Sequence, residues 1–307
     1  MNGKSRSLSQ AITVAIALLG ATFCPALAAP QISGQVQAGG SAIANASVTL
    51  WEATAGAPRQ LGQVKSATDG RFDIASYQTP DSGSSLYVIA RGGTPAASAA
   101  GGDNPAIGLL AVLGSQPPAT VTINEMTTIA SVWTNAQFID SSGIKGNPLG
   151  LRIAAGNVPS FVGLPTGGYG VMIQDALNST QTPTMANFGT LSSVLAGCTR
   201  RVKPDACAEL FAAAVGRDGN APTDTLTAAI SIAHNMAYKP ERVFALLDAF
   251  YPVQGRGLRK TPFLPYLSVA PSAWVLPLHF TGGGYTGGAK VMFDSEGSAW
   301  KIGRAHV

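Results

Sequence analysis

Apolar and polar residues alternate along much of the segment from residue 31 to residue 91. In QISGQVQ and ASVTLWE the apolar positions, separated by polar or small residues, are Ile32, Val36, Val48 and Leu50. This period of two predicts β-strands that bury one face. LYVIA (residues 86–90) is apolar throughout and predicts another strand. Because turn residues separate these short segments, the pattern predicts an all-β antiparallel sandwich.

Asp69-Gly70 is the strongest turn signal in this part of the chain. It stands in ATDGRFDI, between two extended segments. Type I′ hairpin turns need positive φ angles, which glycine adopts without steric cost. We therefore expect a β-hairpin at this position.

Beyond residue 119 the apolar spacing becomes helical. Asn124 is expected to cap a helix that carries Met126, Ile129 and Trp133 on one face. A second apolar stripe runs from Phe188 to Cys198. Three further helices are expected to open at Pro204-Asp205, Pro222-Thr223 and Pro240. Residues 140–182 are rich in Gly, Pro, Asn and Thr and predict irregular structure.

The C-terminal part returns to an extended pattern in AWVLPLHF (273–280) and AKVMFDSEGSAW (289–300). Between them Gly282, Gly284 and Gly287 satisfy G-x-G-x-x-G. A dinucleotide site needs a helix after this loop, because the helix N-terminus holds the pyrophosphate. A strand-like segment follows instead, so we interpret the loop as a connection between strands.

The N-terminus has the organisation of a secretory signal peptide. Lys4 and Arg6 precede an apolar run from Ala11 to Phe23, and PALAAP follows. The run is too short to span a bilayer, and the small residues predict cleavage after Ala28. Cys24 raises the alternative of a lipoprotein, although Phe23 stands where a lipobox needs a small residue. No later stretch predicts a transmembrane segment.

The last seven residues, KIGRAHV (301–307), match the translation of a sequencing adapter, and the alternative is an ordinary polar tail. Without Lys4, Arg6, Lys301 and Arg304, the 20 basic residues fall by 4 to 16, equal to the 16 acidic residues. A neutral mature chain argues against nucleic acid as a partner.

The cysteine and histidine residues indicate neither a catalytic site nor a metal site. Removal of the signal peptide leaves Cys198 and Cys207, and an oxidising compartment favours a disulfide between them. His234 and His279 are far apart in sequence and stand in apolar segments, so we interpret both as structural. Asp218-Gly219-Asn220 lacks the spacing of a calcium loop, and no G-x-S-x-G turn occurs. We therefore expect no catalytic, metal or cofactor-binding residues.

Two segments resemble known families. Gly34-x-Val36 together with Thr68-Asp69-Gly70-x-Phe72 resembles the carboxypeptidase regulatory-like, transthyretin-like domain, which implies a non-catalytic sandwich module. Asp294, Gly297 and Trp300 are similar in spacing to the repeats of NHL and streptogramin-lyase-like β-propellers. That resemblance implies the first, incomplete blade of a propeller.

The predicted organisation is multidomain: a transthyretin-like sandwich, then a mainly α-helical domain, then part of a blade. Its segments are a signal peptide (1–28), a sandwich (29–92), a Gly/Ala/Pro-rich linker (93–118), a helical domain (119–270), the start of a propeller (271–300) and the adapter-like tail (301–307). We expect an exported N-terminal fragment of a longer protein, secreted, periplasmic or on the cell surface. Its expected role is non-catalytic binding or scaffolding toward an unidentified ligand or cell-envelope partner. The alternative is the N-terminal part of a streptogramin-lyase-like enzyme whose active site lies in missing blades.

Overall fold

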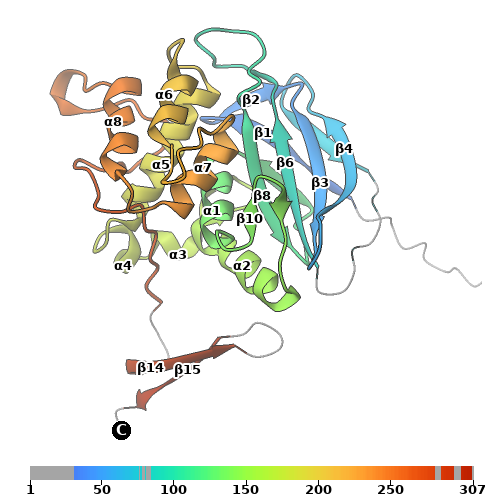
Figure 1. Ribbon diagram of the computed structural model, residues 1–307, viewed down its shortest axis with the longest axis vertical. Helices are drawn as coiled ribbons and strands as arrows, with labels where there is room; N and C mark the ends of the chain where they lie inside the picture. Colours follow the sequence, from blue (N-terminus) through green and yellow to red (C-terminus); the bar gives the residue numbers. More distant parts are fainter. Residues whose placement is uncertain are drawn as a thin grey trace, which may run out of the picture.

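The computed structural model describes residues 31–75, 77, 80, 84–280, 285–293 and 299–305, the last two segments as backbone only (Figure 1). Antiparallel sheets and helices make up the described chain, with the helices gathered on one side of the sheets.

The first sheet has four antiparallel strands in the order β4-β3-β6-β8. The strands are β3 (Ser47–Ala53), β4 (Arg59–Lys65), β6 (Ser85–Arg91) and β8 (Gly108–Gly114). Val48 and Leu50 lie on its inner face and are fully buried. The alternation of apolar positions therefore predicted correctly which face of β3 is buried.

The second sheet is built around β1 (Ile32–Ala38), which pairs with three other strands. Its members are β2 (Ser41–Ala44), β5 (Arg71–Ile74), β7 (Thr94–Pro95) and β9 (Thr120–Ile123). All pairings are antiparallel except that of β9, which runs parallel to β1. Buried residues of both sheets belong to one apolar core, so the two sheets form a sandwich.

The expected linker at 93–118 is not a linker. Within it, β8 pairs with β6 along its length, and six of its seven residues are buried. β9, placed by the sequence in the helical part, joins the second sheet through β1. The Gly- and Pro-rich composition concealed these strands, because the apolar run of β8 is flanked by turn residues on both sides.

The hairpin expected at Asp69-Gly70 is also absent. A turn closes there, with the Gly70 amide donating to the Ala67 carbonyl over 2.9 Å and a Gly70 φ of 78°. However, β4 before the turn pairs with β3, whereas β5 after it pairs with β1. The turn therefore carries the chain from one sheet to the other.

Three of the five longer helices begin within two residues of a predicted start, and a fourth contains the apolar stripe from Phe188 to Cys198. α1 (Glu125–Thr134) and α7 (Thr225–His234) each open with a capping box, at Asn124 and Asp224. The others of this group are α5 (Thr184–Thr199) and α8 (Pro240–Phe250), and the shorter α6 (Ala206–Ala213) follows Asp205. The Asp205 side chain makes no capping hydrogen bond.

α2 (Pro148–Phe161) overturns the expectation of irregular structure over 140–182. Asn147 caps it, because its side-chain oxygen accepts from the Gly150 amide over 2.8 Å, and Pro148 stands in the first turn. Leu151, Ala155 and Val158 are buried along one face. The segment also holds α3 (Val171–Gln174), α4 (Ala176–Ser179) and two small hairpins, β10 (Ile139–Asp140) with β11 (Gly143–Ile144) and β12 (Val162–Gly163) with β13 (Gly168–Tyr169).

A disulfide joins the end of α5 to the start of α6. The sulfur atoms of Cys198 and Cys207 are bonded, with the Cα atoms 4.4 Å apart, which is consistent with the expected pairing. Among the described residues, no helix combines the length and the apolar character needed to cross a bilayer.

The extended segment 273–280 forms no strand. Side chains rather than a neighbouring strand hold it: Asn187 donates to the Val275 carbonyl, and Asn178 bonds both the amide and the carbonyl of His279. Further along, β14 (Tyr285–Phe293) and β15 (Ala299–Ala305) pair antiparallel. β14 covers the first residues of the extended segment expected over 289–300, whereas most of β15 lies in the tail 301–307. Asp294 and Gly297, with most of the glycine loop, lie outside the described residues.

The outer edge of β8 is covered by hydroxyl groups. The amides of Leu110 and Val112 donate over 2.9 Å to the side chains of Thr128 and Ser131 on α1. At the other end of the strand, the Gly108 amide donates to the Thr225 hydroxyl of α7 over 3.0 Å. Helices α1 and α7 thus satisfy an edge that would otherwise expose free main-chain groups.

Candidate functional site

The outer face of the four-stranded sheet carries a row of polar and aromatic side chains. Successive residues of a strand point to opposite faces, so Ser47, Thr49 and Trp51 of β3 point away from the core. Their direct neighbours on β6 are Arg91, Ile89 and Tyr87. The rings of Trp51 and Tyr87 lie parallel within 12°, with centroids 6.5 Å apart.

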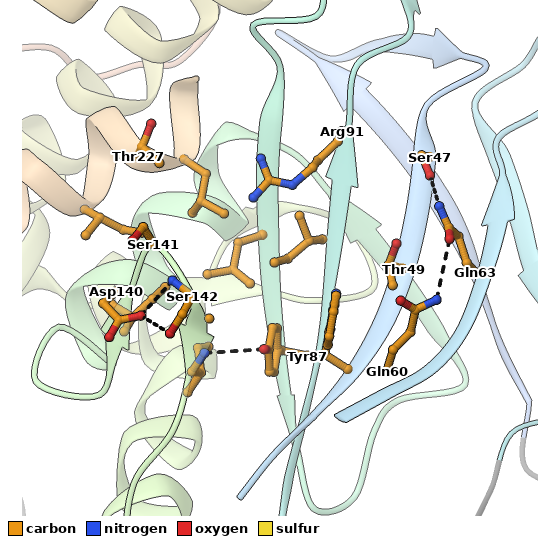
Figure 2. A pocket seen from close by; sticks show the side chains of 18 residues that line it. Ser47, Thr49, Gln60, Gln63, Tyr87, Arg91, Asp140, Ser141, Ser142 and Thr227 are labelled. Carbon is orange, nitrogen blue, oxygen red and sulfur yellow. Dashed lines mark hydrogen bonds between the residues drawn. The ribbon is translucent and has the colours of Figure 1, made fainter. Parts of the chain in front are cut away.

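A β-bulge brings two glutamines to this face. The register between β3 and β4 shifts between Leu50 and Trp51, so Thr49 faces Gln63 and Trp51 faces Gln60. Gln60 donates to the Gln63 side chain over 3.5 Å, and Gln63 donates to the Ser47 hydroxyl. Figure 2 shows this chain of hydrogen bonds, with Thr49 beside the two glutamines.

The hairpin β10–β11 forms the opposite wall. Its tip consists of Asp140, Ser141, Ser142 and Gly143, and Figure 2 shows it across the pocket from the glutamines. The Asp140 carboxylate accepts from the Ser142 amide over 2.7 Å and pairs with Lys145 at 3.1 Å. These interactions, chiefly the hydrogen bond from the Ser142 side chain, lower the pKa of Asp140.

Gly143 sets how closely this hairpin approaches the sheet. The Ile144 amide donates to the Tyr87 hydroxyl over 3.3 Å. A Cβ on Gly143 would stand 2.7 Å from that hydroxyl oxygen, and the φ of 123° is one that side-chain-bearing residues rarely adopt. Burial raises the pKa of Tyr87 to about 12, so its hydroxyl stays protonated at neutral pH.

Helix α7 closes the third side, through Leu226, Thr227 and Ile230. An ion pair fixes the helix to the sheet, because Arg91 on β6 lies 2.5 Å from Asp224, the N-cap of α7. The volume of the pocket is about 320 Å³. This volume lies within the range of small-molecule sites.

Charge in the pocket is neutralised within the protein. Arg91 is paired with Asp224 and Asp140 with Lys145. The remaining polar groups of the lining are the amides of Gln60 and Gln63 and the hydroxyls of Ser47, Thr49, Tyr87, Ser141, Ser142 and Thr227. Such groups both donate and accept hydrogen bonds, so the lining suits a neutral ligand with many polar groups.

None of the residues singled out in the sequence lines this pocket. Cys198 and Cys207 lie on α5 and α6. His279 belongs to the extended C-terminal segment, whereas His234 and Asp218 line a second hollow beside α7. Within the part of the chain that the structure describes, no group of three or more His, Cys, Asp or Glu side chains could hold a metal ion.

The pocket residues escaped sequence reasoning because they occupy the polar positions of alternating strands. Such positions normally face solvent, so the pattern gives no reason to distinguish Ser47, Thr49, Gln60 and Gln63 from an ordinary solvent-exposed sheet face. Trp51 was the available signal, since a large aromatic residue at an outward strand position often marks a binding surface.

Comparison of the chain with protein-family models, with curated proteins and with solved structures finds no match. The resemblances to a transthyretin-like sandwich and to a propeller blade therefore stay predictions.

Proposed function

We propose that this chain is a non-catalytic binding protein whose pocket on the outer face of the β4-β3-β6-β8 sheet takes a saccharide. One observation carries the proposal: the partly exposed ring of Trp51, which stacks on the buried ring of Tyr87, lies on the same sheet face as Gln60, Gln63 and Thr49. Saccharides present apolar C–H faces to aromatic rings and hydroxyls to amides and alcohols, and this face offers both kinds of partner.

The balance of charge supports a neutral ligand. Anionic ligands usually meet cationic side chains with bidentate geometry. Arg91 is the only cationic side chain among the described lining residues, and it forms an ion pair with Asp224 at 2.5 Å. The pocket therefore favours neutral sugars over phosphorylated ones.

A variant of Trp51 tests the proposal. We expect Trp51→Ala to weaken binding of neutral saccharides by about fivefold to thirtyfold, because losing the aromatic contact costs about 1–2 kcal/mol. Binding is measured by titration calorimetry against N-acetylglucosamine, glucose and their β-1,4-linked oligomers. Gln60→Ala should also weaken binding, whereas Gln137→Ala, an exposed glutamine outside the pocket, should not.

Thermal denaturation of each variant controls for folding. The proposal fails if no saccharide binds the wild-type protein, or if Trp51→Ala folds normally and binds as tightly as wild type.

Export is the second part of the proposal, and the bonded pair Cys198–Cys207 supports it. Disulfides persist outside the cytosol, in periplasmic, secreted and surface proteins. We expect the protein recovered from the periplasm or the medium to resist maleimide labelling until it is reduced. Two freely reacting thiols in that material would contradict this assignment.

A further inference from the structure

We infer that the ligand is a linear oligosaccharide that extends from the pocket, across the tip of β10–β11, into a second hollow beside α7. This inference rests on the proposed function and adds a second subsite to it. The second hollow measures about 350 Å³ and lies between the loop 218–223 and helix α7.

The two hollows adjoin each other, because they share part of their lining. Ser141, Thr227 and Ile230 line both of them. Ser141 is exposed at the hairpin tip, whereas Ile230 of α7 is almost fully buried. A molecule that fills both hollows would therefore contact a polar side chain from the hairpin and an apolar one from the helix.

The second hollow shares hydroxyl and amide groups with the first, but none of its described lining residues is Trp, Tyr or Phe. Asp218 and Asn220 form a polar pair, because the Asn220 side-chain amide donates to the Asp218 carboxylate over 2.7 Å. That bond, the largest contribution, lowers the pKa of Asp218, so the carboxylate is an ionised acceptor for hydroxyl groups. His234 stands opposite on α7, with its Nε2 atom 2.7 Å from the Ala136 carbonyl oxygen.

A saccharide fits this groove better than an extended peptide. Peptides in this conformation usually bind by adding a strand to an exposed sheet edge. β8 presents the edge nearest α7, and the amides of Leu110 and Val112 on that edge are bonded to Thr128 and Ser131. The edge of β8 is therefore closed to strand addition by a peptide.

Chain length is the decisive variable in the test. We expect the affinity for one series of neutral β-1,4-linked oligomers, from one to six units, to rise about tenfold or more once the oligomer reaches the second hollow. Asn220→Ala should lower the affinity for the long oligomers about tenfold and leave that for the monosaccharide within about twofold. Asn157→Ala, an exposed asparagine on α2 outside both hollows, is the matched control and should change neither.

The outcomes separate this inference from the proposed function. If monosaccharide and hexasaccharide bind the wild type equally, or if Asn220→Ala weakens both alike, the second subsite is wrong and the saccharide pocket stands. If no saccharide binds, the proposed function fails as well. A pool of unrelated octapeptides that binds in place of the oligomers would overturn the ligand class.

Discussion

At the scale of single residues, Glu125 is an ionisable group held in the protein interior. Its carboxylate is fully buried at the start of α1 and accepts from the Gly39 amide, with both oxygens at 3.1 Å, and from the Thr199 hydroxyl. It therefore connects the turn between β1 and β2 to the ends of α1 and α5. Burial raises its pKa, although these hydrogen bonds and the charge of Arg200 act in the opposite direction.

This shift predicts a pH-dependent stability. The folded state binds the Glu125 proton more tightly than the unfolded state, whose glutamate pKa is about 4.3. The free energy of unfolding should therefore contain a contribution that is full below that value and is lost as the pH rises through the folded-state pKa. In Glu125→Gln this loss should be absent, because a neutral amide replaces the carboxyl group.

Urea denaturation of both proteins between about pH 4 and pH 8 measures the effect. The stability of wild type relative to Glu125→Gln should fall as the pH rises from about 4.3 and should level off above the folded-state pKa of Glu125. A difference that stays constant would mean that folding leaves the pKa of Glu125 unchanged.

At the scale of elements, the edge of β8 shows how helices and sheet depend on each other. Thr128 accepts from the Leu110 amide and donates to the Asn124 carbonyl over 2.7 Å, so one hydroxyl serves both the strand and the helix. A sequence pattern could place Asn124 at the helix start, because capping is a local interaction. It could not indicate that the hydroxyl of Thr128 would meet a strand.

Removing that hydroxyl should destabilise the protein. Thr128→Val keeps the shape of the side chain but leaves the buried Leu110 amide without its acceptor, which costs about 1–3 kcal/mol. Thr128→Ser keeps the hydroxyl and is the matched control. Chemical denaturation should show a lower free energy of unfolding for the valine variant than for the serine variant. Equal values would mean that the edge bond contributes nothing.

At the scale of the whole molecule, the sandwich and the helices share one core. The same continuous set of buried contacts includes Val48 and Leu50 of β3, Leu110 of β8, Ile129 of α1 and Leu195 of α5. β8 is buried between the sandwich and the helices, so it stabilises both. A sequence boundary drawn at residue 92 removes β8 and β9 from the sheets that they complete.

This arrangement predicts how fragments behave. Residues 31–280 should unfold in a single cooperative transition, because the core is continuous. Residues 31–92 lack β8 and β9 and should show no cooperative transition and no near-ultraviolet circular dichroism from packed aromatic rings. A sharp thermal transition in the short fragment would contradict this prediction and would mean that the sandwich at 29–92 folds independently.

Local patterns in the sequence were sufficient to place several strands, the buried face of β3, the starts of α1 and α8, and the turn at Asp69-Gly70. These features depend on residues within a few positions of each other, through periodicity, capping or turn geometry. Tertiary structure alone decided which sheet each strand joins, that β8 is a strand with a covered edge, and that α2 forms. It also created the pocket, because Trp51, Gln63 and the β10–β11 tip meet only after segments some ninety residues apart pack together. Until that packing occurs, the outward positions of β3 and β4 are indistinguishable from a face exposed to water.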